Sequence, residues 1–465
     1  MLLCLSGALF FISCRTSPAP DSETGIAAVP DTSSDDPEEL ELDEERDQAL
    51  LEKIRGALQQ NETSRALELF ADLEYGDDGS LAFVHAALLV AEDEIEPARD
   101  ILERYAEGSV RARVLLAEIT EDPVERREAF EYALEAEPDH PDALAGLGLT
   151  LLEMGELDAA GQRFNAALEK APESVTALQG AAEVAARNDE SQARIEYLER
   201  AVSHAQDAGY LHAELARALQ AENRDDEALD SFDRAVELEP GNPWHYVDRG
   251  RLHQSSGRHE EAVDDFSSAI GLNDSVFLFY HYRAESLLNL NRFEAALEDY
   301  EHVVGERPDY SDAYAPLATL YYRFERYNEA AEYFLRAWGR VSSDLSFPML
   351  AGVSYRLAGN NERAKALFRD VERNADRSSL YFDMAREFID PRRDSRTEQL
   401  VRRESHVGMQ ARMRFYLGVL YEMQGRQRAA EYLFLQVRDA GQTGFVETEL
   451  AEVHLSRNGG GGYPQ

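Results

Sequence analysis

A repeat with a spacing of 34 positions constrains this chain more than any other feature. Bulky side chains recur at that spacing from residue 164 onward: Phe164, Leu198, Phe232, Phe266, Tyr300, Phe334 and Phe368. Alanine stands four residues before most of them, and glycine or alanine stands sixteen residues before each. A spacing kept over so many consecutive units indicates a repeat architecture in which each unit packs only on its neighbours.

Each unit is expected to fold as two helices joined by a tight turn. The apolar and small residues of the first helix share one helical face, as in Leu144, Leu147, Gly148 and Leu151. The second helix repeats this pattern with Ala160, Phe164, Ala167 and Leu168. Gly155 suits the turn between them, and Pro172 ends the unit. A single helix pair cannot bury its apolar face, so the units must stack.

The period and its residues resemble the tetratricopeptide repeat (TPR) family over most of residues 47–455. The resemblance implies an all-α, right-handed superhelical solenoid of helix-turn-helix repeats. It divides the chain into degenerate repeats (47–140), seven repeats that keep the regular spacing (141–378), a distorted repeat (379–410), a further repeat (411–444), a capping helix (445–457) and a flexible tail (458–465). The unit that starts at Val175 is degenerate, because Arg194 stands where alanine is expected.

The N-terminus indicates export rather than a folded element. Residues 2–13 carry no charge and are too few to span a bilayer, but they have the length of a signal-peptide apolar region. The run ends at Cys14 and resembles the lipobox of bacterial lipoproteins, in which the cysteine carries lipid. We therefore expect a signal peptide over 1–13 and a lipid-anchored Cys14. An ordinary secretory signal and a chance apolar start are the alternatives.

Residues 14–46 are expected to form a disordered acidic tether. Eleven acidic side chains lie between Asp21 and Glu45, with no basic residue among them and no apolar periodicity. Such a segment cannot bury enough apolar surface to offset the entropy of ordering it, and its like charges extend it. The tether would hold the folded part away from a membrane, whereas a specific binding tail is the less favoured interpretation.

The overall charge excludes broad nucleic-acid binding. The formal net charge is −43, and only Lys53, Lys170 and Lys365 are lysines. Affinity for a phosphate backbone comes from Lys and Arg side chains, and in this chain they are outnumbered by acidic side chains. No zinc-binding spacing, nucleophile elbow or phosphate loop occurs, and Gly146-Leu147-Gly148 lies inside a predicted helix. We therefore expect no catalytic residue, no cofactor and no metal.

Partner-binding residues follow from the resemblance alone. In this family the first helix of each unit lines the concave face, and the matching positions carry aromatic, arginine and other large side chains. These are Tyr210, Arg217, Trp244, Arg251, His281, Tyr322, Arg323, Met349, Arg356 and Phe415. Aromatic and arginine residues are common binding anchors. A solvated or packing role is the alternative for each residue taken singly.

One segment departs from the global charge. Seven arginines and three acidic residues lie between residues 392 and 414, and the arginines are Arg392, Arg393, Arg396, Arg402, Arg403, Arg412 and Arg414. Such a patch could dock an acidic partner or a phosphate-bearing envelope polymer. Local charge compensation within an acidic solenoid is the alternative.

The sequence thus favours a non-enzymatic scaffold of the bacterial cell envelope, anchored by lipid and facing the periplasm. Its concave groove would bind other proteins or peptides. Two alternatives stay open, namely a TPR component of a secretion or solute-uptake assembly, and a cytosolic TPR scaffold if Cys14 is unmodified. The oligomeric state stays open too.

Overall fold

The computed structural model describes residues 49–58, 62–70, 80–107, 109–391, 396–441 and 444–458. The predicted signal peptide, Cys14, the tether and the residues after Asn458 lie outside this part of the chain. Within the described residues the chain is helical and contains no β-strand. The chain divides into two units, residues 1–238 and 239–465, which are described separately.

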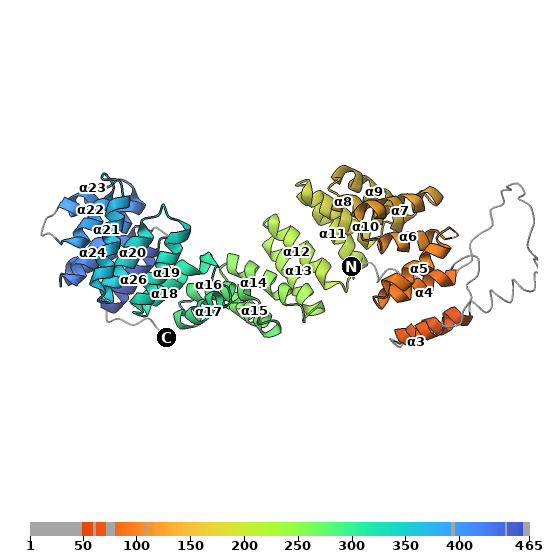
Figure 1. Ribbon diagram of the computed structural model, residues 1–465, viewed down its shortest axis with the longest axis horizontal. Helices are drawn as coiled ribbons and strands as arrows, with labels where there is room; N and C mark the ends of the chain where they lie inside the picture. The colour runs from red at the N-terminus through yellow and green to blue at the C-terminus, as the bar shows by residue number, and fades with distance from the viewer. Residues whose placement is uncertain are drawn as a thin grey trace, which may run out of the picture. The chain divides into compact units, whose positions relative to one another are not determined.

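The first unit consists of helices packed in consecutive pairs (Figure 1). The predicted degenerate repeats contain α3 (Thr63–Glu68), α4 (Ser80–Ala91), α5 (Ile95–Tyr105), α6 (Val110–Glu118) and α7 (Pro123–Ala136). They are followed by α8 (Pro141–Glu153), α9 (Leu157–Lys170), α10 (Val175–Arg187), α11 (Ser191–His204), α12 (Gly209–Ala221) and α13 (Asp225–Leu238).

The second unit continues the same pairing. It begins with α14 (Pro243–Ser255), α15 (His259–Leu272), α16 (Phe277–Asn289), α17 (Phe293–Glu306), the 3₁₀ turn Ser311–Ala313, α18 (Tyr314–Arg323) and α19 (Tyr327–Arg340). It ends with α20 (Ser346–Leu357), α21 (Asn361–Asn374), α22 (Leu380–Ile389), α23 (Arg396–Arg403), α24 (Val407–Met423), α25 (Gln427–Asp439) and α26 (Val446–Asn458). The distorted repeat is the short pair α22 and α23.

The turn inside each repeat is set by one residue in the left-handed region. The residues with positive φ recur every 34 positions, at Gly155, Asp189, Asn223, Gly257, Asn291, Glu325 and Gly359. This conformation ends the first helix and lets the next amide bond back, as when the Glu156 N–H donates to the Leu151 carbonyl at 2.8 Å. The turn chemistry therefore keeps the same phase as the core.

Each bulky residue of the period fills a slot made by small residues. Phe164 is fully buried, and its ring lies against Gly148 of its own repeat and Gly180 of the next. A Cβ added at Gly148 would stand 2.6 Å from that ring, and one added at Gly180 would stand 2.2 Å from it. Gly146 makes the same approach to Phe130 of the preceding pair. These glycines serve the packing of the rings.

In the degenerate repeat, the residue after the missing alanine position takes the buried place. Arg194 is half-buried, and Ile195 takes the fully buried position beside it. Arg194 lines a shallow hollow of about 190 Å³ together with Asp189, Ser191 and three alanines from α10 and α12. The guanidinium therefore stays at the surface while the repeat keeps its core.

Candidate functional site

The predicted groove is partly filled by the chain itself. In the second unit Tyr322, Met349 and Phe415 are fully buried, and His281 is 7% exposed. The expectation that these four side chains line an open groove is therefore wrong for this structure. Helix α26 covers Tyr322 and Phe415, because it returns from α25 to contact α18 and α24 (Figure 1), whereas His281 packs on the Tyr300 and Tyr310 rings.

One end of α26 is held by polar contacts to α18 and α24. The Tyr322 hydroxyl lies 2.7 Å from His454 Nε2, and His454 Nδ1 lies 2.6 Å from the Glu422 carboxylate. The His454 ring also stacks on Phe434, with the ring centres 4.7 Å apart. Arg457 donates to the backbone carbonyls of Tyr322 at 3.1 Å and Arg323 at 2.8 Å. A cation at the last carbonyls of α18 is favoured by the helix dipole.

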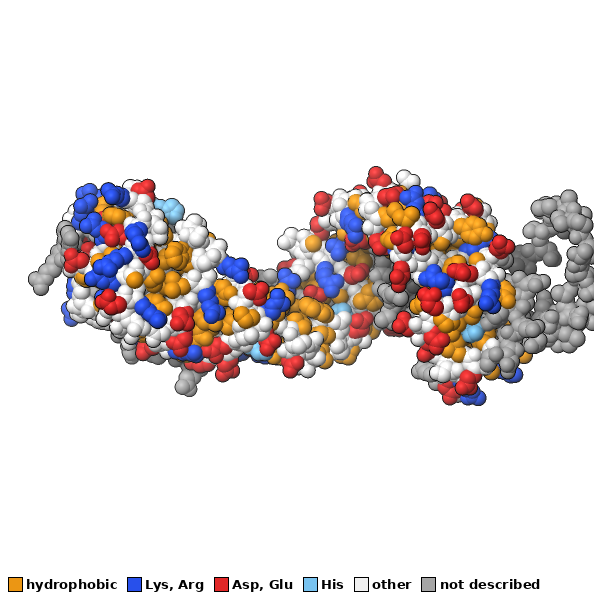
Figure 2. Space-filling view, viewed as in Figure 1, with side chains coloured by type: hydrophobic (Ala, Val, Ile, Leu, Met, Phe, Trp, Pro, Cys, Tyr) orange, Lys and Arg blue, Asp and Glu red, His pale blue; other side chains and the backbone are white. Residues whose placement is uncertain are grey.

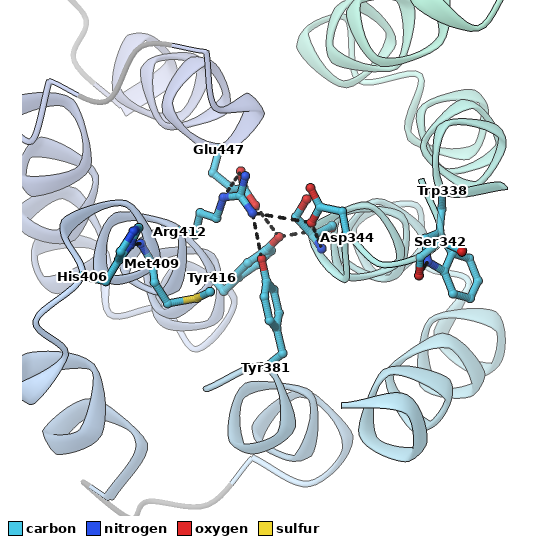
Figure 3. Close-up of polar contacts among 10 residues, drawn as sticks. Trp338, Ser342, Asp344, Tyr381, His406, Met409, Arg412, Tyr416 and Glu447 are labelled. Carbon is cyan, nitrogen blue, oxygen red and sulfur yellow. Dashed lines mark hydrogen bonds and ion pairs between the residues drawn. The ribbon is translucent and has the colours of Figure 1, made fainter. Parts of the chain in front are cut away.

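The other end of α26 inserts a buried carboxylate. Glu447 is 1% exposed and accepts a hydrogen bond of 2.7 Å from the Tyr416 hydroxyl. The Arg412 guanidinium lies 3.7 Å from Glu447 and 3.5 Å from Asp344, and it also donates to the Tyr381 hydroxyl at 3.2 Å. Figure 3 shows these side chains converging, with Arg412 and Tyr416 from α24, Glu447 from α26, Tyr381 from α22 and Asp344 from the segment before α20. One cation thus faces a buried carboxylate, Glu447, and a partly exposed one, Asp344.

The electrostatics of this cluster follow from burial. Burial raises the pKa of Glu447, although Arg412 opposes the rise. Burial also raises the pKa of Tyr416, and Glu447 adds to that rise. The carboxylate therefore carries a desolvation cost in its ionised form.

An open part of the inner face remains on α14 and α16. Trp244 is 48% exposed and packs edge-to-face on Phe279, with ring centres 5.2 Å apart. Arg251 is exposed and lies over the Tyr282 ring at 5.4 Å. Glu285 lies on the same helix as Tyr282, and its carboxylate approaches the buried His281 imidazole at 3.5 Å. An exposed aromatic ring, a cation and a carboxylate thus lie on neighbouring first helices.

The other predicted groove residues are divided between packing and solvent. Arg323 stacks on the Phe293 ring at 3.6 Å, and half-buried Arg356 donates to the Phe388 carbonyl at 2.9 Å. In the first unit Tyr210 is half-buried and Arg217 is exposed. Partner binding by these residues stays a prediction.

The predicted basic patch is smaller than its sequence suggests. Arg392 and Arg393 lie outside the described residues. Arg396, Arg402 and Arg403 are exposed on α23, and Arg402 pairs with Glu398. Lys and Arg side chains gather over α22 and α23 in Figure 2.

Arg412 does not belong to that surface, because it points into the cluster with Glu447 and Asp344; this part of the predicted patch is wrong. Half-buried Arg414 lies close to Tyr432, and burial lowers the pKa of its guanidinium.

Two buried ion pairs were not predicted from the sequence. Arg249 binds Asp265 with both carboxylate oxygens engaged, at 2.6 and 3.0 Å. Arg283 binds Asp299 in the same way, at 2.7 and 2.8 Å. Both aspartates are buried. The signal was available, because the two arginines are separated by one repeat spacing, and so are the two aspartates.

Within the described residues, no helix has the length and apolarity needed to cross a membrane, and no group of three His, Cys, Asp or Glu side chains could hold a metal ion.

Paired helices with a left-handed turn at a fixed phase, and a bulky ring in a slot of small residues, define a helical repeat solenoid. Family models of the tetratricopeptide repeat match residues 121–183 and, in overlapping windows, residues 213–277, 247–311 and 281–344. The chain therefore contains TPR repeats, and the fold class predicted from the period is confirmed. TPR proteins are typically scaffolds for protein–protein interaction.

Several solved structures are similar to parts of the chain. YrrB, described as a TPR protein with an unusual peptide-binding site, is 22% identical over 40% of this chain and 96% of its own, with a TM-score of 0.37. Pseudomonas aeruginosa pilF is 20% identical over 44% of this chain and 94% of its own, with a TM-score of 0.39. A TPR protein from Parabacteroides merdae is 14% identical over 68% of this chain and 99% of its own, with a TM-score of 0.36. No curated protein matches the chain.

Proposed function

We propose that the protein is a non-enzymatic scaffold of the bacterial cell envelope that binds a partner protein on the open inner face of α14 and α16. The observation that carries this proposal is the exposure of Trp244 and Arg251, which lie two turns apart on one face of α14. Large aromatic rings are otherwise mostly buried in these repeats, and an exposed tryptophan with an arginine on the same face is the composition of a binding hot spot.

The location of the face supports the proposal. The inner side of α18 and α24 is covered by α26, so a partner cannot use it in this arrangement. The inner side of α14 and α16 keeps Trp244 and Arg251 exposed. A partner segment with an apolar side chain for the Trp244 ring and a carboxylate for Arg251 fits this surface.

Crosslinking in cells tests the proposal. A photoreactive amino acid in place of Trp244 is expected to trap a specific protein, and Trp244→Ala with Arg251→Ala is expected to lower recovery of that protein at least tenfold. Tyr432→Ala is the matched control, because Tyr432 is a 62% exposed aromatic side chain on the second helix of its repeat. Equal recovery by the Trp244/Arg251 variant and the control would reject the proposed face.

The lipid anchor is a separate part of the proposal. Its support is the uncharged run of residues 2–13 that ends at Cys14. Labelling with a radioactive fatty acid is expected to mark the wild-type chain and to vanish in Cys14→Ala. Labelling that persists in Cys14→Ala would reject the anchor without affecting the binding face.

A further inference from the structure

The inner face of α18 and α24 is covered by α26 in the way that a ligand covers a binding groove. Tyr322 and Phe415 stand at inner-face positions of their repeats, are fully buried and contact the His454 ring of α26. Phe334 fills the bulky position of its repeat, and Phe434 fills that of the last repeat, where it stacks on His454 of α26. Helix α26 thus packs on the last repeat and also reaches α18, which belongs to an earlier repeat.

The contacts of α26 mix apolar and polar groups as a protein interface does. Leu450, Ala451 and Val453 are almost fully buried. At the two ends, Glu447 reaches Arg412, and Arg457 reaches the last carbonyls of α18. Removing one partner of a buried charge pair is strongly unfavourable, so a helix without a matching acidic residue would leave Arg412 poorly paired. Another helix with the same arrangement of apolar and charged side chains can therefore take the place of α26.

The connection to α25 permits such a replacement. Gly441 and Gly444 flank the segment between α25 and α26, and both adopt positive φ, at 61° and 86°. Glycine reaches many other conformations from there at little cost. Helix α26 is also the last described element, so its movement drags no later described helix with it.

We propose that α26 is an intramolecular ligand that gates a helix-binding groove on α18 and α24. The partner that fits is a short helix with an acidic residue near its N-terminus for Arg412, an apolar face like that of Leu450 and Val453, and an arginine near its C-terminus for the end of α18. It binds only by displacing α26. This groove is distinct from the face on α14 and α16, so each can be tested without the other.

The first experiment is hydrogen exchange on the full wild-type chain. The proposal requires α26 to open separately, so its amides are expected to exchange at least tenfold faster than those of α24 and α25. Exchange of all three helices at one common rate would overturn the proposal, because α26 would then be an inseparable part of the core.

The second experiment adds the ligand in trans. The probe is a fluorescent synthetic peptide of residues 445–458, and the protein is the full chain with His454→Ala and Arg457→Ala, which loosen α26 but leave the groove intact. The apparent Kd equals the intrinsic Kd divided by the fraction of open groove, so the loosened variant is expected to bind the peptide at least tenfold more tightly than wild type. A peptide with Leu450→Glu and Val453→Glu is the matched control and is expected not to bind.

Three results would contradict the proposal. The peptide could bind wild type and variant equally, the control peptide could bind as well as the native one, or the variant could dimerise without peptide. The last result would assign the groove to a second copy of the chain. If the variant fails to fold, the hydrogen-exchange result on wild type decides.

Discussion

The slot around Phe164 predicts opposite outcomes for two glycine substitutions. In Gly180→Ala the new Cβ would stand 2.2 Å from two ring atoms of Phe164, whereas in Gly161→Ala it would meet only a Val184 methyl at 3.4 Å. Both glycines lie inside helices, α10 and α9. Alanine at either position therefore gains about 1 kcal/mol of helix propensity.

The two substitutions differ in their packing cost. Ordinary contact begins near 3.4 Å, so the Phe164 ring or α10 would have to shift by roughly 1 Å, and overpacking of this kind costs about 1–3 kcal/mol. We take the upper end, because the ring is fully buried with no free space to turn into. Gly180→Ala is thus expected to destabilise by about 2 kcal/mol and Gly161→Ala to stabilise by up to about 1 kcal/mol.

Urea unfolding followed by circular dichroism measures the difference, as a lower midpoint for Gly180→Ala and a higher one for Gly161→Ala at the same slope. Equal midpoints would refute the reasoning, because they would show that the slot adapts to a methyl group without cost.

Two further predictions concern buried charges. Burial raises the pKa of Glu447 above the value of about 4.3 expected in the unfolded chain, so its folded state binds a proton more readily and its ionisation opposes folding as pH rises. Glu447→Gln is therefore expected to be more stable than wild type at pH 7 and to lose that advantage as pH falls toward 4. Thermal unfolding measured across this pH range tests it, and an advantage that grows on acidification would contradict it. Asp299→Ala is expected to lower the free energy of unfolding by about 3 kcal/mol, because it leaves the partly buried Arg283 without its carboxylate. Asp139→Ala breaks an exposed pair with Lys170 and is expected to leave the urea midpoint nearly unchanged. Equal losses in urea unfolding would contradict this.

The period predicted the fold because the same residues set the core and the turns. Phe164 and its equivalents fill the slots, and Gly155 and its equivalents end the first helices, all at one spacing. The repeated pair of Arg249 with Asp265 could also have been found, since it recurs one repeat later as Arg283 with Asp299. Local pattern is sufficient for these features because each repeat contacts mainly its neighbours.

The occupied groove could not be predicted in the same way. The contact between Tyr322 and His454 joins residues 132 positions apart, and Arg412 reaches Asp344 across 68 positions. Such contacts depend on how far the inner face curves over several repeats, a property that no single repeat encodes. The family pattern assigns Tyr322, Met349 and Phe415 to the inner face, but it does not say what covers that face.

Exposed and buried inner-face residues differ in what covers them. An aromatic side chain at an inner-face position is exposed only where no helix of the chain returns over it, as at Trp244. Where α26 returns, the same kind of position holds Tyr322 and Phe415 in a dry contact. Side chains suited to binding therefore occur at inner-face positions throughout the solenoid. Whether they are available to a partner depends on whether α26 returns over them.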